Sequence, residues 1–385
     1  MRLLFADFDL PYQMRDIDHP IGGWSIELKA WLRALRDAGH QAGVLTWRGA
    51  REYVGVQDLC ELLEAYDPSR GIRVARYFYA YIPGMLAAAR GFRPDVVLQA
   101  CAGVQTGALA FVAQRLGVPF VHRVASDIDV DERYKAKLSS GEGLAFRYGL
   151  ARSALFLCQN DYQARSLRRR YPAAKSSVIH NPIELGHDLP AIRPRGERRY
   201  VAWLGVFKKA KDLPLLERIA RSQPTVSFRV GGMPGINADS ETAAALTALK
   251  TLPNVEMVGY VRRTSVYGFL GQASALLSTS AYEGFSNTFL EAFAAGTPVV
   301  ARRAVDPDSI IGRNDLGLVA DDAPGLSDAV VDLGAMGDEK YSRLTERCRD
   351  YVVTNHSGRS KVPELIEAIR PILERSDSPS CGSSK

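Results

Sequence analysis

Two carboxylates, Glu283 and Glu291, stand eight positions apart in the C-terminal third of this sequence. A carboxylate repels phosphate, but it accepts hydrogen bonds from vicinal hydroxyls such as those of a ribose or a hexose. Glu283 is expected in a turn and Glu291 in the helix that follows it. That turn is expected to offer backbone N–H groups, which bind phosphate. Phosphate donors beside two diol acceptors describe a site for a nucleotide-sugar. The charges alone leave a second interpretation open, an ordinary βαβ unit with a solvated acidic helix start.

A strand, a glycine-containing turn, a helix and a second strand are expected to position these acids. Residues 275–280 and 299–301 are short apolar runs typical of buried strands. The helix between them is expected to begin at Ser286 or Asn287 and to stop at Gly296. Such a unit directs amide groups and the positive end of the helix dipole to the carboxyl edge of a sheet, where anions bind.

The segment from Ser280 to Val300 resembles the E-x7-E signature of retaining GT-B glycosyltransferases, specifically glycosyltransferase family 4. The shared pattern is Ser-x-x-Glu-Gly-Phe-x-Asn-x-x-x-Glu-Ala-x-Ala-x-Gly-Thr-Pro-Val-Val. By this resemblance, Glu283 contacts the transferred sugar and Glu291 contacts the nucleotide ribose. The resemblance also implies that a stretch of backbone holds the donor's sugar and phosphates, namely Gly284, Phe285, Ser286, Asn287 and Thr288.

The family's diphosphate site is only partly matched. Gly205 ends an expected strand over residues 200–204, and Lys211 stands where the family has a phosphate-binding lysine. Val206 occupies the position of a family arginine, so one counter-charge is absent. Lys208 or Lys209 could supply it, although neither stands at the motif position.

The expected strand over residues 255–258 ends in a turn that lies beside the nucleobase in the family. Gly259, Tyr260 and Val261 are therefore candidates for contact with the base. Ordinary packing of a tyrosine is the alternative at Tyr260.

The first half of the chain matches the family more loosely. Gly22 and Gly23 precede a helix and resemble a family turn that faces the acceptor, with a merely tight turn as the alternative. As a nucleotide fingerprint the pair fails, because the third spaced glycine is missing. Ala125 stands where many family members have a donor-contacting histidine. Asp127, after a strand over residues 120–124, is the better candidate to bind an acceptor or sugar hydroxyl, although aspartate also caps turns.

Strands and helices alternate regularly, which predicts an α/β protein with parallel doubly wound sheets. A length of 385 residues favours two domains. The resemblance implies the GT-B fold, two Rossmann-like domains facing a cleft. We expect an acceptor domain over 1–182, a linker over 183–199 rich in Pro, Gly and Arg, and a donor domain over 200–362. A helix over about 363–376 is expected to cross back onto the first domain, and the tail 377–385 to be disordered.

The resemblance implies transfer of a glycosyl group from a nucleotide-diphosphate sugar to a hydroxyl acceptor with retention, as in polysaccharide biosynthesis. The acceptor would be a glycan, a lipid-linked saccharide or a small molecule. We expect Lys211, Glu283 and Asp127 to act in catalysis, with no metal and no further cofactor. A nucleotide-sugar 2-epimerase and a non-catalytic nucleotide-sugar-binding protein of the same fold are the alternatives.

Composition sets the wider limits. The chain is 46% hydrophobic and 24% charged, without an apolar run long enough to span a bilayer. Five scattered cysteines and the absence of a signal-peptide pattern predict reduced thiols in a cytoplasmic protein. The net charge of +6 concentrates in residues 151–200. These arginines indicate a solvated face, a peripheral contact with the inner face of an anionic membrane, or attraction to a phosphorylated acceptor. They do not indicate nucleic-acid binding, since aromatic platforms are missing.

Overall fold

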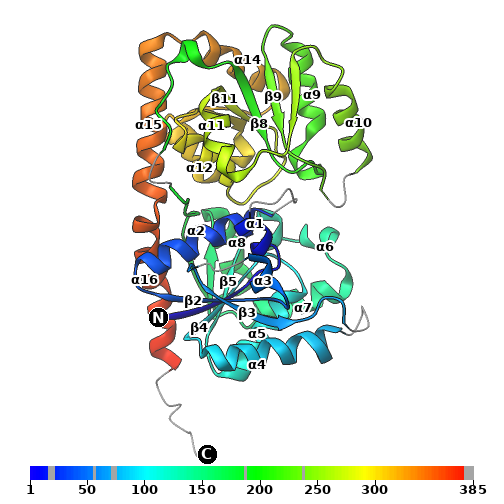
Figure 1. Cartoon of the computed structure of the whole chain (residues 1–385), viewed down its shortest axis with the longest axis vertical. Helices are drawn as coiled ribbons and strands as arrows, with labels where there is room; N and C mark the ends of the chain where they lie inside the picture. Colours follow the sequence, from blue (N-terminus) through cyan, green and yellow to red (C-terminus); the bar gives the residue numbers. More distant parts are fainter. Residues whose placement is uncertain (16–21, 55–57, 71–75, 186–188, 236–238, 377–385) are drawn as a thin grey trace, which may run out of the picture. The chain divides into compact units, whose positions relative to one another are not determined.

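The computed structural model describes residues 1–15, 22–54, 58–70, 76–185, 189–235 and 239–376. The tail expected to be disordered, 377–385, lies outside these residues, as do 186–188 of the expected linker. By its internal contacts the chain divides into two units (Figure 1). The first comprises residues 1–15, 24–182 and 358–385, and the second comprises 16–23 and 183–357.

The first unit is built on a seven-stranded sheet in the order β3-β2-β1-β4-β5-β6-β7, and every pair of neighbours is parallel. The order changes direction between β1 and β4, as in a doubly wound sheet. The strands are β1 (Arg2–Ala6), β2 (Gln41–Trp47), β3 (Glu61–Tyr66), β4 (Val96–Ala100), β5 (Phe120–Arg123), β6 (Leu155–Cys158) and β7 (Lys175–Val178).

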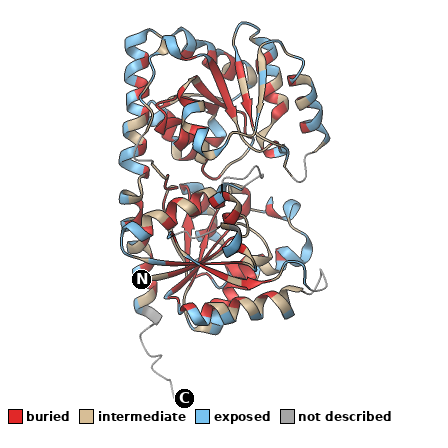
Figure 2. Cartoon of the chain, in the orientation of Figure 1, coloured by how far each residue is buried: buried red, intermediate tan, exposed pale blue. Residues whose placement is uncertain are grey.

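Helices cover both faces of this sheet because alternate residues of each strand point to opposite faces. In β1, Leu3 and Phe5 belong to one buried cluster with side chains of α2 and α16, whereas Leu4 and Ala6 belong to another with α4 and α5. Figure 2 shows the inner strands, such as β4, β5 and β6, as continuously buried, whereas the edge strand β7 is half-buried. The helices are α1 (Leu10–Arg15), α2 (Gly23–Asp37), α3 (Ala50–Val54), α4 (Ile82–Phe92), α5 (Val104–Leu116), α6 (Tyr134–Lys137), α7 (Ser140–Leu150), α8 (Asp161–Arg170) and α16 (Gly358–Ser376), with shorter helical turns at η1 (Tyr77–Tyr81) and η2 (Asp127–Val130).

The second unit repeats this architecture with a six-stranded parallel sheet in the order β10-β9-β8-β11-β12-β13. One apolar cluster forms its core. The strands are β8 (Tyr200–Leu204), β9 (Phe228–Gly231), β10 (Val255–Gly259), β11 (Ala273–Ser278), β12 (Val299–Arg302) and β13 (Gly317–Ala320). The helices are α9 (Leu213–Ser222), α10 (Ser240–Leu249), α11 (Val266–Gly271), α12 (Asn287–Ala294), α13 (Ile310–Arg313), α14 (Ala323–Ala335) and α15 (Asp338–His356), with turns η3 (Arg195–Glu197), η4 (Lys209–Lys211), η5 (Arg263–Ser265), η6 (Arg303–Val305) and η7 (Pro307–Ser309).

Two parallel, doubly wound units form the GT-B fold that the sequence predicts. The contacts divide the chain after Pro182 and group residues 183–199, the expected linker, with the second unit. The chain rejoins the first unit at Gly358, whereas the sequence predicts about 363. Helix α16 runs through both Pro363 and Pro371. The four cysteines that the structure describes are free.

Candidate functional site

The point where the strand order changes direction defines the candidate site of the second unit. This point lies between β8 and β11, and ligands of open α/β sheets bind at the carboxyl ends of such strands. Gly205 follows β8, and the turn that carries Glu283 follows β11. A Cβ on Gly232, whose φ is +151°, would lie 1.9 Å from the Gly205 carbonyl oxygen, so only glycine fits there. Gly205 and Gly232 therefore contribute only backbone atoms to this edge of the sheet, which we call the floor of the site.

Lys211 and Glu283 meet at this edge. Lys211 Nζ lies 2.5 Å from Glu283 Oε1, and the two side chains are 16% and 19% exposed. Ser280 Oγ donates a second hydrogen bond to the same oxygen at 2.7 Å. Burial disfavours the charged form, but the charge of Lys211 and the hydrogen bonds from Lys211 and Ser280 lower the pKa of Glu283. The acid is thus held ionised beside a cation that is itself within reach of solvent.

The backbone around Lys211 is fixed by the loop after β11. Thr279 Oγ1 donates to the Lys211 carbonyl at 2.6 Å, and the amide of Ala281 donates to the carbonyl of Ala210 at 2.9 Å. Trp203 Nε1 donates to Thr279 Oγ1 at 3.0 Å, which ties the loop to β8. These contacts explain how a lysine distant in sequence comes to face Glu283.

The N-terminus of α12 borders a small cavity beside Lys211. Ser286, one of the two residues that the sequence predicts for this position, is the N-cap residue, and its side chain makes no capping hydrogen bond. The side chains that line the cavity are hydroxyl-bearing or apolar, with Lys211 as its cation: Trp203, Leu204, Lys211, Leu276, Leu277, Ser278, Ser280, Ser286, Thr288 and Phe289. Phe285 is 6% exposed and its ring packs 5.4 Å from His356, so its backbone alone can serve a ligand.

Glu291 lies in the second turn of α12 and is 3% exposed. It forms an ion pair with Arg263, which follows the turn after β10. Burial works against the charge of Arg263, but Glu291 raises the pKa of this guanidinium by its charge and by accepting its hydrogen bond. Sequence reasoning missed Arg263. The signal that could have identified Arg263 is its position three residues after Tyr260, in the turn expected to lie beside the nucleobase.

Gly259 and Tyr260 lie at the end of β10. Gly259 has a φ of +71°, and its carbonyl accepts a hydrogen bond from the Gly232 amide at 2.7 Å. The strand-end turns after β9 and β10 are therefore joined at the same edge as Gly205. Tyr260 is half-buried.

Gly22 and Gly23 are exposed, and their contacts group them with the second unit. Asn287 Nδ2, in the first turn of α12, donates to the Gly23 carbonyl at 2.7 Å. Gly23 is also the first residue of α2. Their role toward an acceptor stays a prediction.

Asp127 lies at the carboxyl edge of the first sheet but is engaged by protein groups. Its Oδ1 accepts from Asn160 Nδ2 at 2.8 Å and from Gln163 Nε2 at 2.9 Å. These bonds tie η2 to the start of α8. A role of Asp127 toward an acceptor or sugar hydroxyl stays a prediction. Among the residues that the structure describes, no group of three or more metal-type side chains gathers at Asp127 or elsewhere.

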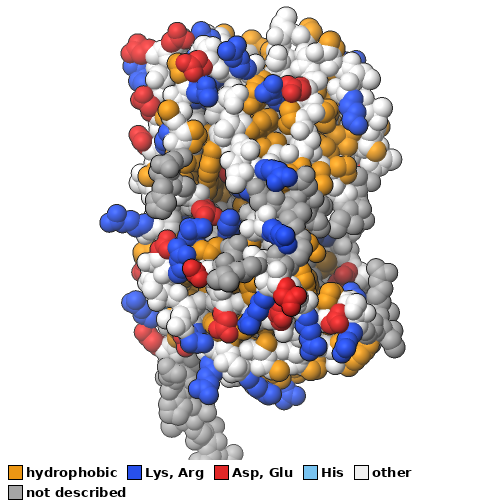
Figure 3. Space-filling view, in the orientation of Figure 1, with side chains coloured by type: hydrophobic (Ala, Val, Ile, Leu, Met, Phe, Trp, Pro, Cys, Tyr) orange, Lys and Arg blue, Asp and Glu red, His pale blue; other side chains and the backbone are white. Residues whose placement is uncertain are grey.

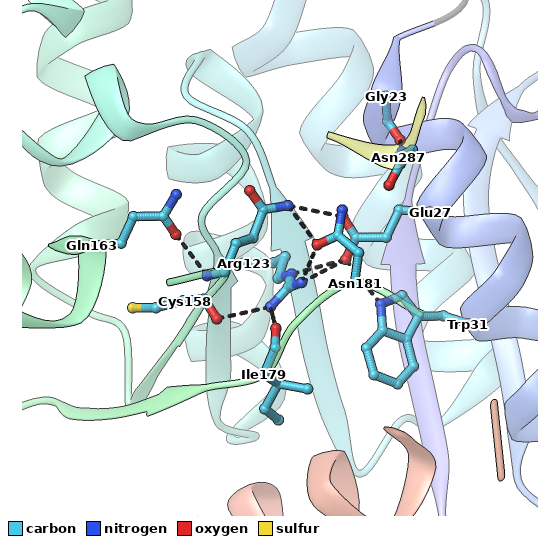
Figure 4. A network of polar contacts seen from close by, with 10 residues as sticks. Gly23, Glu27, Trp31, Arg123, Cys158, Gln163, Ile179, Asn181 and Asn287 are labelled. Carbon is cyan, nitrogen blue, oxygen red and sulfur yellow. Dashed lines mark hydrogen bonds and ion pairs between the residues drawn. The ribbon is translucent and has the colours of Figure 1, made fainter. Parts of the chain in front are cut away.

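Sequence reasoning did not anticipate a buried polar network in the first unit (Figure 4). Arg123, 1% exposed, donates from Nε to Glu27 Oε1 at 2.9 Å and from Nη2 to Asn181 Oδ1 at 2.8 Å. Its Nη1 donates to the Ile179 carbonyl at 2.7 Å. Gln159 Nε2 donates to both Glu27 Oε2 and Asn181 Oδ1, at 3.2 and 2.9 Å. The network fixes α2 to the residues at which the chain leaves this unit.

The arginines of residues 151–200 are partly compensated. Arg170 and Arg195 pair with Glu132 and Asp338 at 3.4 and 2.7 Å, and Arg198 is 8% exposed. Figure 3 shows basic and acidic side chains intermingled on the face drawn. Within the described ranges, none of the helices combines the length and apolarity needed to cross a bilayer. Contact with a membrane surface stays a prediction.

Comparisons with known proteins agree with the fold. The family model described as glycosyltransferase family 4 matches residues 21–187, and the one described as glycosyl transferases group 1 matches residues 210–335. Glycogen synthase of Mycobacterium tuberculosis is 30% identical over 164 residues, which are 41% of this chain and 39% of that protein. The chain spans less than half the length of the curated relatives it matches.

Two solved structures share the fold over nearly their whole length. Sucrose-phosphate synthase from Thermosynechococcus elongatus has a TM-score of 0.79 at 17% identity, covering 97% of this chain and all of that one. HepE of Anabaena, in complex with UDP and glucose, has a TM-score of 0.73 at 14% identity, covering 96% and 100%. Both are GT-B neighbours of this chain.

Proposed function

We propose that this chain is a retaining GT-B glycosyltransferase of the family 4 type, which transfers a sugar from a nucleotide-diphosphate sugar to a hydroxyl acceptor. The observation that carries the proposal is the Lys211–Glu283 pair beside the N-terminus of α12, at the carboxyl edge of the second sheet. A cation, helix amides and a diol-accepting carboxylate within one site match the phosphates and hydroxyls of such a donor.

In the proposed reaction, the bond between the anomeric carbon and the diphosphate oxygen breaks, and a bond to the acceptor oxygen forms on the same face of the sugar. The acceptor proton passes to the departing phosphate oxygen. Because the breaking bond leaves its electron pair on the phosphate oxygen, negative charge grows on the diphosphate in the transition state. Lys211 and the amides at the start of α12 are suited to stabilise this charge. Glu283 holds the sugar hydroxyls.

The proposal assigns the positive charge to Lys211 and the helix, and needs no metal or further cofactor. Neutralisation of phosphate by a fixed ammonium and by oriented amides is a general alternative to a cation from solution. Chelation with EDTA should leave turnover unchanged. A loss of turnover that added Mg²⁺ restores would overturn this part of the proposal.

For the donor, a relative's bound ligands give a starting point: the structure of HepE contains UDP and glucose. Glycogen synthase acts, by its name, in forming a polysaccharide. We propose a glycan, a lipid-linked saccharide or a small molecule with a free hydroxyl as the acceptor, and a cytoplasmic site of action. A thermal-shift panel of UDP-, GDP-, ADP- and dTDP-sugars tests the donor, since a bound ligand raises the melting temperature.

Transfer and retention need a product assay. With the stabilising donor and a panel of glycan acceptors, the anomeric configuration of the product, read by NMR, should equal that of the donor. Glu291→Ala should weaken donor binding, because it removes a proposed ribose contact. The variant should still fold. Inverted product would refute retention, and unchanged donor affinity in Glu291→Ala would refute the site assignment.

The same assays separate the two alternatives. A nucleotide-sugar 2-epimerase would convert the donor to its epimer without any acceptor. A non-catalytic binding protein would be stabilised by the donor but would neither transfer nor hydrolyse it. We favour the transferase because the lysine and the helix N-terminus converge where charge develops during transfer.

A further inference from the structure

Asp212, which directly follows Lys211, has an unusual backbone conformation. Its φ is +46° and its ψ is +62°, in the left-handed region that residues other than glycine adopt at a cost. Asp212 ends η4 and is also the N-cap of α9, so the chain changes direction immediately after Lys211. A residue persists in this region where its surroundings hold it there, and such residues gather at functional sites.

Each carboxylate oxygen of Asp212 has its own partner. Oδ1 accepts a hydrogen bond from the Leu215 amide at 3.2 Å, which caps α9. Oδ2 lies 2.9 Å from Nη2 of Arg302, and both side chains are 23% exposed. The helix cap needs only the first oxygen. The ion pair with Arg302 is therefore a second contact, which holds Asp212 from another part of the sheet.

Arg302 belongs to a strand that is not adjacent to β8. It is the last residue of β12, and β11 lies between β12 and β8 in the sheet. The loop after β11 holds the two residues before Asp212, since it donates hydrogen bonds to the carbonyls of Ala210 and Lys211. Three successive residues, 210–212, are thus each held by a contact from a neighbouring strand end.

The location of the Lys211 ammonium depends on this backbone. A lysine carries its charge on a flexible four-carbon side chain, so a shift of its Cα moves the ammonium as well. Lys211 lines the cavity beside α12, whereas Arg302 is not one of the described residues that line it. A displacement of about 1 Å in a catalytic group can lower a rate by about 10²-fold. An effect of Arg302 on turnover would therefore pass through Asp212 and Lys211.

We propose that Arg302 is a positioning residue, which fixes Asp212 and thereby keeps the ammonium of Lys211 where negative charge develops on the diphosphate. This inference rests on the proposed function for the role of Lys211. It extends the site to β12, a strand that carries none of the other candidate residues.

The first test is steady-state kinetics with the donor identified by thermal shift. Arg302→Gln, which removes the ion pair, should lower kcat roughly tenfold and change KM for the donor by less than about twofold, because the lost stabilisation belongs to the transition state. Arg302→Lys should recover part of kcat, because it returns the charge. Asp212→Asn keeps an oxygen for the helix cap and tolerates the left-handed backbone, so it should lower kcat as much as Arg302→Gln does.

A double-variant cycle separates positioning from a general loss of structure. In the Lys211→Ala background, Arg302→Gln should lower kcat by less than about twofold, because no ammonium is left to position. A structural defect would cost the same factor in both backgrounds. Arg303→Gln is the matched control, since it changes the neighbouring arginine, which pairs with Asp321 at an exposed position. This variant should have the wild-type kcat.

Lysine NMR tests the position of the ammonium without any donor. After reductive ¹³C-methylation of the lysines, the signal of Lys211 is identified by its absence in Lys211→Ala. It should shift in Arg302→Gln and stay in place in Arg303→Gln. A wild-type kcat in Arg302→Gln, an equal loss in the Lys211→Ala background, or an unmoved Lys211 signal would each overturn the inference. If the signal shifts in Arg302→Gln but the wild-type protein turns over no donor, the proposed function is refuted instead.

Discussion

Lys211 and Glu283 lie 72 positions apart in the sequence, yet their Nζ and Oε1 atoms are 2.5 Å apart in the structure. The pair forms because β8 and β11 are neighbours in the sheet, so the loops that follow them meet at one edge. A lysine tied on one side to a carboxylate keeps its ammonium in place while its remaining N–H groups can bind phosphate.

Removing the lysine should therefore affect turnover more than folding. We expect Lys211→Ala to lower kcat by roughly 10²-fold, comparable to the loss of one transition-state donor. Steady-state kinetics with the donor identified by thermal shift measures this. Lys250→Ala, at an exposed lysine after α10, is the matched control and should leave kcat unchanged. Equal kcat values for the two variants would contradict a role for Lys211 in charge stabilisation.

Gly232 gives a prediction about the floor of the site. A methyl group there would collide with the Gly205 carbonyl oxygen at 1.9 Å, and φ is +151°. We expect Gly232→Ala to destabilise the protein by roughly 1–3 kcal/mol. It should also weaken nucleotide binding, because the backbone at residue 232 must move away from Gly205 to make room for the methyl group. Urea unfolding and calorimetry measure the two effects. Gly268→Ala, in helix α11 with open space around the new methyl group, should be neutral or stabilising.

The sequence predicted local units well and long-range polar pairs poorly. The helix from Asn287 and its cap at Ser286 follow from capping and apolar spacing, which are local signals. The ion pairs of Arg263 and Arg123 join residues 28 and 96 positions apart, and their partners are chosen by sheet order and helix packing. No local spacing encodes such a choice, although an arginine inside the expected strand 120–124 already signals a buried partner.

The sequence predicts the ends of helices and strands poorly where the hydrophobic pattern is weak. The edge strand β3, Glu61–Tyr66, has paired leucines rather than strict alternation, so its sequence does not predict a strand. Helix α16 was expected to start at Pro363 because proline favours the first turn. It begins at Gly358 instead, directly after Ser357, whose extended backbone ends α15.

Asp7, at the carboxyl end of β1, predicts a pH dependence of stability. Burial, and then the charge of Asp9, raise the pKa of Asp7 to about 7. The folded protein thus binds a proton that the unfolded chain releases above its ordinary pKa of 3.8, so stability falls as pH rises from about 4 to about 7. Ser25 Oγ and two backbone amides donate to this carboxyl, and an asparagine oxygen can accept the same bonds.

Asp7→Asn should remove this loss of stability. Relative to wild type, we expect the variant to gain free energy of unfolding between pH 4 and pH 8, by at most about 4 kcal/mol. Urea unfolding at several pH values measures the difference. Asp37→Asn, at an exposed carboxylate 59% accessible, should show a flat difference over the same range. A flat difference for Asp7→Asn as well would show that Asp7 is ionised in the folded state at neutral pH.

The Arg123–Glu27 pair gives the last prediction, since both side chains are 2% exposed. Arg123→Met leaves Glu27 buried without its cation, and should destabilise the protein by roughly 3–5 kcal/mol. Arg123→Met/Glu27→Leu removes both charges and should recover much of that loss, because burial of two apolar side chains replaces an ion pair at little net cost. Urea unfolding measures both, with Arg343→Met, at an exposed helical pair with Glu339, expected within about 0.5 kcal/mol of wild type. A double variant as unstable as Arg123→Met would show instead that the bonds of Arg123 to Asn181 and to the Ile179 carbonyl, and not its pairing with Glu27, hold this part of the first unit together.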